Sequence, residues 1–110
     1  MRTIFTLVFA VATGPAFADG MATGSYECWY FSQAQSSLNF DVTGPGSYTG
    51  YDGSPGTFTI SADGQVTFES GPLQGVMPDG FTAKYEVRQG RPTLSYISGR
   101  GAEAAFCEHT

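Results

Sequence analysis

Apolar and polar residues alternate along several short stretches of this chain, and the two clearest stretches are separated by an Asp-Gly pair. In the first, Phe58 and Ile60 alternate with threonine and serine. In the second, Val66 and Phe68 alternate with polar residues. A period of two with β-branched and aromatic residues indicates strands that bury one face.

The Asp63-Gly64 pair between the two stretches predicts a tight β-hairpin. We expect a type I′ turn, in which both central residues need a positive φ that Asp and Gly tolerate. The register then places all four apolar residues on one face. A slip by one residue would move them all to the other face, so the register should be well specified.

The same alternation predicts six further strands, separated by turns rich in glycine and proline. A single helical turn at 33–35 and a helix at 102–106 are the alternatives to an entirely β structure. Gly71-Pro72 begins a crossing loop with Leu73 turned inward, because Pro72 cannot lie in a central strand. The further strands are expected at residues 24–31, 38–42, 47–51, 81–88, 93–98 and 102–107.

About eight short strands favour an antiparallel meander closed as a barrel, because closure removes exposed strand edges. A two-sheet sandwich is the alternative. The interior of such a barrel is just wide enough for side chains, so we expect rings to fill it and leave no deep cavity. The inward residues are expected to be Leu38, Phe40, Val42, Tyr48, Phe58, Ile60, Val66, Phe68, Leu73, Phe81, Tyr85, Val87, Leu94, Tyr96 and Phe106.

The two cysteines, Cys28 and Cys107, lie in the first and last predicted strands. A barrel makes those strands neighbours, and a disulfide needs Cα atoms within about 7 Å. We therefore expect a disulfide, which would close a loop of about 80 residues and stabilise the fold by roughly 4–5 kcal/mol.

Residues 1–18 have the pattern of a secretory signal peptide: a basic start, a short apolar run and a small-x-small site ending at Ala18. The apolar run is too short to span a membrane, which needs about 20 residues. We expect one domain, residues 19–110, in the periplasm or outside the cell, with residues 19–23 as a frayed polar lead.

The formal net charge is −5, and removing Arg2 with the leader makes it −6. This acidic balance argues against nucleic acid or an anionic membrane as partner, since both bind basic patches. We expect a monomer.

Groups with catalytic or metal-binding potential are sparse. His109 is the only histidine and lies in a chain end that we expect to fray, which argues against a catalytic triad or a metal site. Glu27, Glu69 and Glu86 would support a hydrolase only if they shared a cleft. The sequence therefore predicts no enzyme, no metal and no cofactor.

Aromatic residues make up 15% of the chain, more than a small core requires. Trp29, Phe31 and Tyr51 are the ones expected to face outward. Such a cluster would mark a recognition surface for a protein or a sugar. The alternative is that neighbouring segments cover these rings.

The pattern of Cys28, Phe40-x-Val42, Val66-x-Phe68 and Cys107 with its glycine-containing turns resembles uncharacterised small secreted bacterial β-domain proteins. The outline is similar to calycin-like barrels of bacterial protease inhibitors, a likeness of size and strand count that implies no function. We expect a non-catalytic exported domain that binds a protein or envelope component in an inhibitor-like way. The alternative is a small-ligand or glycan binder at an open barrel end, and a hydrolase is the least favoured.

Overall fold

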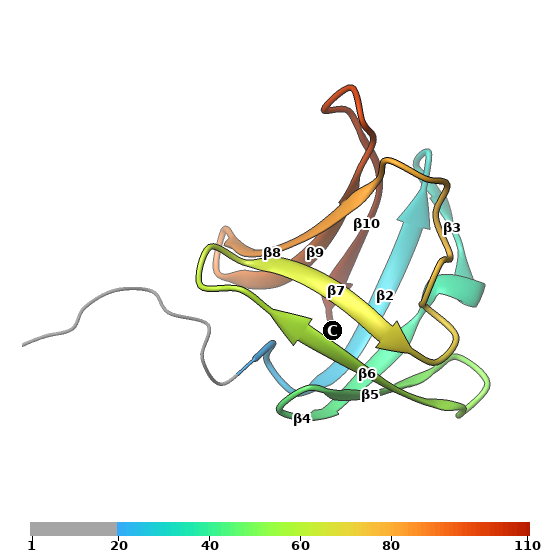
Figure 1. Ribbon diagram of the computed structural model, residues 1–110, viewed down its shortest axis with the longest axis vertical. Coiled ribbons are helices and arrows are strands. Elements are labelled where there is room, and N and C mark those ends of the chain that lie inside the picture. Colours follow the sequence, from blue (N-terminus) through green and yellow to red (C-terminus); the bar gives the residue numbers. More distant parts are fainter. Residues whose placement is uncertain (1–19) are drawn as a thin grey trace, which may run out of the picture.

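The structure is a computed structural model that describes residues 20–110, and it is entirely β apart from one 3₁₀ turn. The predicted leader lies outside the described residues and stays a prediction. Figure 1 shows the strands curving around a single core. They are β2 (Gly24–Tyr30), β3 (Gln33–Ala34), β4 (Phe40–Gly44), β5 (Ser47–Gly50), β6 (Pro55–Ile60), β7 (Gln65–Ser70), β8 (Thr82–Arg88), β9 (Arg91–Ile97) and β10 (Glu103–His109), with the 3₁₀ turn η2 at Ser36–Leu38.

The sheet closes on itself. From β4 to β10 each strand pairs antiparallel with the next, and β2 joins the two ends by pairing with both β4 and β10. β3 adds a two-residue strand beside the end of β2. The predicted closed barrel is confirmed, and the sandwich alternative is wrong.

The predicted disulfide is confirmed at the closing seam. Cys28 and Cys107 lie directly opposite each other in β2 and β10. The backbone groups of Cys28 point away from β10: its N–H donates to Asn39 Oδ1 at 2.8 Å and its carbonyl accepts from Gln35 N at 2.9 Å. Cys28 and Cys107 therefore form a non-hydrogen-bonded pair, the type in which facing side chains are closest.

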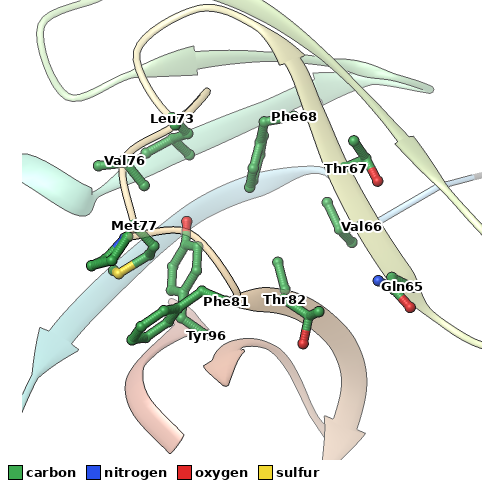
Figure 2. A pocket seen from close by; sticks show the side chains of 13 residues that line it. Gln65, Val66, Thr67, Phe68, Leu73, Val76, Met77, Phe81, Thr82 and Tyr96 are labelled. Atoms are coloured by element: carbon green, nitrogen blue, oxygen red, sulfur yellow. The ribbon is translucent and has the colours of Figure 1, made fainter. Parts of the chain in front are cut away.

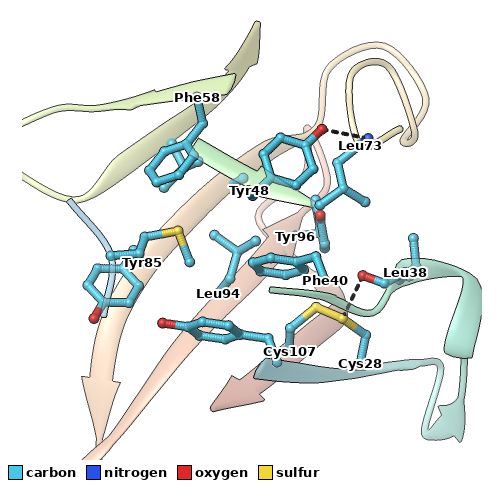
Figure 3. Packing of buried hydrophobic residues seen from close by; sticks show 14 of the residues in the cluster. Cys28, Leu38, Phe40, Tyr48, Phe58, Leu73, Tyr85, Leu94, Tyr96 and Cys107 are labelled. Carbon is cyan, nitrogen blue, oxygen red and sulfur yellow. Dashed lines mark hydrogen bonds between the residues drawn. A yellow bond between two sulfur atoms is a disulfide. The ribbon is translucent and has the colours of Figure 1, made fainter. Parts of the chain in front are cut away.

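Aromatic rings fill most of the interior, as predicted (Figure 3). Ten of the expected inward residues are buried, and Ile60, Phe68 and Phe81 are half-buried against them. Met21 is also buried, with Ala22 N donating to the Tyr85 hydroxyl and Ala22 O accepting from Tyr26. The expectation of a frayed polar lead is therefore wrong for Met21 and Ala22, which close one barrel end.

Two residues assigned to the interior lie elsewhere. Phe106 precedes the inward Cys107, and strand alternation therefore turns it to the outer wall. Val87 pairs with Pro92 next to the β8–β9 turn, where the strands pass the rim of the barrel. Its side chain is 57% exposed.

The hairpin between β6 and β7 forms in the predicted register, with Phe58 opposite Phe68 and Ile60 opposite Val66. The type I′ prediction is wrong, because Gly64 has φ 93° while Asp63 does not have a positive φ. The strands are joined instead by residues 61–64, with one left-handed glycine in the loop.

Local details also differ from expectation near both ends of the described chain. The single helical turn forms at Ser36–Leu38 instead of residues 33–35, where β3 pairs with β2. His109 is not frayed: it ends β10 opposite Tyr26, and its Nε2 lies 2.7 Å from the Thr23 carbonyl oxygen.

The barrel wall is incomplete between β7 and β8. The two strands pair only at Gln65 with Lys84 and Val66 with Ala83, and then diverge. The connection between them, residues 71–81, covers the gap. Leu73 is buried there as predicted, and its N–H donates to the Tyr48 hydroxyl at 2.9 Å.

Candidate functional site

The structure does not bring the three aromatic candidates together. Phe31 follows the last residue of β2 and is 68% exposed, and Tyr51 follows β5 and is 63% exposed. The strand pairings place Gly50, the last residue of β5, level with Tyr26 in β2. Phe31 therefore lies about four residues, or roughly 13 Å, further along the strand direction than Tyr51.

Trp29 is half-buried on the outer wall of the barrel, one residue from the disulfide. Its ring stacks on Phe106 with centroids 5.3 Å apart and an interplanar angle of 19°. The two residues are direct cross-strand partners in β2 and β10. Trp29 is thus part of a wall contact, not of an open barrel end.

Phe31 has an unusual backbone conformation for an aromatic residue. Phe31 and Ser32 form the two-residue turn between β2 and β3, with φ of 49° and 68°. Asn and Gly are the usual residues in such a turn, and a bulky residue in the left-handed region costs roughly 1–2 kcal/mol. The turn geometry does not explain the choice of phenylalanine.

The exposed Phe31 ring is nevertheless held in place. Its backbone N–H donates to the Ala104 carbonyl at 3.0 Å, which ties the turn to the start of β10. Its ring lies edge-on to Tyr30 with centroids 4.5 Å apart. A fixed aromatic side chain loses little conformational entropy when a partner covers it.

A groove of about 280 Å³ lies beside Tyr30, between the β2–β3 hairpin and the 71–81 loop. Figure 1 shows this loop running past β3 at the same end of the molecule as the hairpin turn. Val76, in the groove wall, is 37% exposed. We call Phe31 together with the groove residues the hairpin end. The groove is lined by Tyr30, Gln35, Ser37, Leu38, Val76, Met77 and Pro78.

The sequence interpretation missed the contribution of the loop. Val76, Met77 and Pro78 were part of a crossing loop with no assigned role. The signal in the sequence was the apolar Val-Met-Pro run in a loop otherwise rich in glycine. Loops run over the protein surface, where such apolar side chains are not needed for solubility.

Charged side chains are paired on the outer wall of β8 to β10. The Arg88 guanidinium donates to Glu86 at 2.7 Å, to Glu103 at 2.6 Å and to the buried Ser95 hydroxyl at 2.6 Å. The hydrogen bond from Arg88 lowers the pKa of Glu103. Glu86 and Glu103 thus share one guanidinium as their counterion.

The three glutamates considered for hydrolysis are far apart. Glu27 and Glu86 lie on the same outer face, separated by Glu108 and Thr93 on the intervening strands, or about 14 Å for three strand spacings. Glu69 and Glu86 lie on opposite sides of the Gln65–Lys84 pair, about 20 Å apart along the strands. Paired carboxylates in glycoside hydrolysis are about 5–9.5 Å apart.

Within residues 20–110 no group of three or more His, Cys, Asp or Glu side chains is placed to hold a metal ion. Over the same range, no helix has the length and apolar character needed to cross a membrane.

Neither protein-family models, nor curated proteins, nor solved structures give a match to this chain.

Proposed function

We propose that this protein is an exported, non-catalytic binding module that docks on a protein partner through the hairpin end. The observation that carries the proposal is Phe31, an exposed aromatic residue fixed at a left-handed backbone position. Strained backbone positions that the fold does not require are concentrated at functional sites.

The surroundings of Phe31 support a polypeptide as the occupant. The groove beside Tyr30 is open and combines apolar side chains with Gln35 and Ser37, and aromatic and methionine side chains are enriched in the centres of protein interfaces. The formal net charge of the chain is −5, which favours a partner surface that is neutral or basic.

Export is part of the proposal. The predicted leader at residues 1–18 and the disulfide between Cys28 and Cys107 both support an oxidising compartment. The periplasm and the extracellular space are both compatible with these features.

The test is the variant Phe31→Asn, with Tyr51→Asn as matched control at an equally exposed aromatic residue in another turn. Asn suits the left-handed position, so Phe31→Asn should raise the free energy of unfolding by about 1 kcal/mol while abolishing partner binding. Partners captured from a periplasmic extract by the wild type would be purified and their Kd for each variant measured. The proposal requires a partner that Tyr51→Asn retains and Phe31→Asn loses at least tenfold in affinity; equal affinities would overturn it.

A further inference from the structure

A second site lies inside the barrel wall, beneath the 71–81 loop. Because β7 and β8 separate beyond Val66 and Ala83, a cavity of about 220 Å³ opens between them. Figure 2 shows side chains from β7, β8, β9 and the loop converging on this space. The cavity is open to solvent, where the polar Gln65, Thr67 and Thr82 line it, and its apolar lining includes Val66, Phe68, Leu73, Met77, Phe81 and Tyr96.

One polar group in this lining has no partner. Tyr96 is 3% exposed, and its hydroxyl has no hydrogen-bond partner among residues 20–110. Figure 2 shows this hydroxyl directed into the space bounded by Leu73, Met77 and Phe68. A buried hydroxyl without a partner is rare, since its desolvation is not compensated.

The neighbouring Tyr48 shows that the core can satisfy a buried phenol. Its hydroxyl donates to the Ser70 carbonyl at 2.8 Å and accepts from Leu73 N at 2.9 Å. The Tyr96 hydroxyl, which faces the cavity, lacks any such arrangement. Burial raises the pKa of Tyr96, so its hydroxyl remains protonated and able to donate.

We propose that this cavity binds a small uncharged ligand, largely apolar, with one hydrogen-bond acceptor placed against the Tyr96 hydroxyl. No residue that lines the cavity carries a charged side chain, so a carboxylate or ammonium group would find no counterion there. An apolar cavity of about 150 Å³ accommodates benzene, and the larger volume here suits about nine heavy atoms. Aryl or alkyl ketones, esters and aldehydes of that size have the required chemistry.

The proposed ligand site and the proposed docking surface at the hairpin end depend on different residues and can be tested separately. Tyr96, Phe68 and Phe81 take no part in the proposed docking surface, and loss of protein binding would leave the ligand site untested and intact. Three residues line both the cavity and the groove, so both tests leave them unchanged: Val76, Met77 and Pro78.

The experiment uses acetophenone and α-methylstyrene as probes, two molecules of nearly the same shape that differ in having a carbonyl or a methylene group. Kd values would be measured by NMR titration of the mature protein. One neutral hydrogen bond contributes about 0.5–1.5 kcal/mol, so the wild type should prefer acetophenone by about three- to tenfold. The shifted resonances should belong to Val66, Phe68 and Met77.

Three variants sharpen the result. Tyr96→Phe should bind both probes with equal affinity, and Tyr51→Phe, the same change on the surface, should keep the wild-type preference. Ala83→Val projects two extra methyl groups into the cavity and should weaken both probes at least tenfold. If Tyr96→Phe fails to fold, Ala83→Val and the resonance map still decide the question.

Several outcomes would overturn the proposal. They are affinities weaker than about millimolar for both probes, equal affinity for the two in the wild type, or a carbonyl preference that survives Tyr96→Phe. The proposal would also be rejected if an ordered water occupies the Tyr96 hydroxyl and neither probe binds.

Discussion

The hydroxyl oxygen of Tyr48, in β5, lies 2.9 Å from the backbone nitrogen of Leu73, in the loop between β7 and β8. The same hydroxyl donates to the Ser70 carbonyl at 2.8 Å. A single core phenol therefore fixes the start of the loop that covers both the cavity and one side of the groove (Figure 3).

Tyr48→Phe should lower the free energy of unfolding by about 1–3 kcal/mol, because it leaves the buried N–H of Leu73 without an acceptor. Tyr96→Phe is the matched comparison, since it removes a hydroxyl with no partner among residues 20–110 and should leave stability unchanged or raise it. Urea unfolding of both variants measures the difference. A larger loss for Tyr96→Phe would show that its hydroxyl has a partner in solution.

Gly71→Ala should be more destabilising than Gly75→Ala. Both glycines have positive φ, 92° and 70°, but a Cβ at Gly71 would lie 2.6 Å from the Gly56 Cα, whereas space around Gly75 is open. We expect losses of about 2–4 kcal/mol for Gly71→Ala and about 1 kcal/mol for Gly75→Ala. Thermal unfolding of both variants, with the unfolding enthalpy measured, gives the change in stability of each. Equal losses of stability would contradict the close packing of Gly71 on Gly56.

Replacing both Cys28 and Cys107 by alanine should lower stability by about 4–5 kcal/mol, the chain-entropy value for a loop of 79 residues. The loss should appear chiefly as a lower urea midpoint. Reducing the wild-type protein should produce a similar loss. A change below about 1 kcal/mol in both experiments would mean that the seam between β2 and β10 closes without help from the bond.

Arg88→Gln should raise the pKa of Glu103 back toward its ordinary value, because the hydrogen bond from Arg88 is the main cause of its lowering. A carboxyl group with a lowered folded-state pKa contributes stability above its unfolded pKa, near 4.5, and loses it as the pH falls through the folded value. The contribution should be below about 1 kcal/mol, since the pair is partly exposed. NMR titration of Glu103 tests this, with Arg91→Gln as the control that should leave Glu103 unaffected.

Trp29 and Phe106 should be energetically coupled. Their rings stack at 5.3 Å on the outer wall, and aromatic pairs contribute about 0.5–1.5 kcal/mol beyond burial. A double-mutant cycle with Trp29→Ala and Phe106→Ala should yield a coupling energy in that range. Additive losses would instead indicate that each ring packs separately on the wall.

Much of the fold follows from local pattern. Alternation located every barrel strand to within a few residues, and the positions of Cys28 and Cys107 in the first and last strands favoured closure. The wrong placement of Phe106 could also have been recognised from the sequence, because adjacent residues of a strand, here Phe106 and Cys107, point to opposite sides. Val87 could not be judged this way, because its phase is correct and only the height of the rim exposes it.

The candidate sites were less accessible to such reasoning. The sequence suggested that Trp29, Phe31 and Tyr51 could be exposed, but their separation depends on which strands are neighbours. The groove arises where the 71–81 loop meets the β2–β3 hairpin, two segments some 40 residues apart. The left-handed conformation of Phe31 follows from the tight turn into β3, a strand too short to be seen in the pattern.

What the sequence by itself determined is the set of strands, the facing of most core side chains and the closing disulfide, because a period of two and a cysteine pair are properties of the chain read locally. Only the tertiary structure decided that β7 and β8 part after two residue pairs, that a loop covers the gap and that Tyr96 is left facing a cavity. Those features depend on where segments distant in sequence meet, and hydrophobic patterning, which records only whether a side chain is buried, contains no information about the neighbour it is buried against.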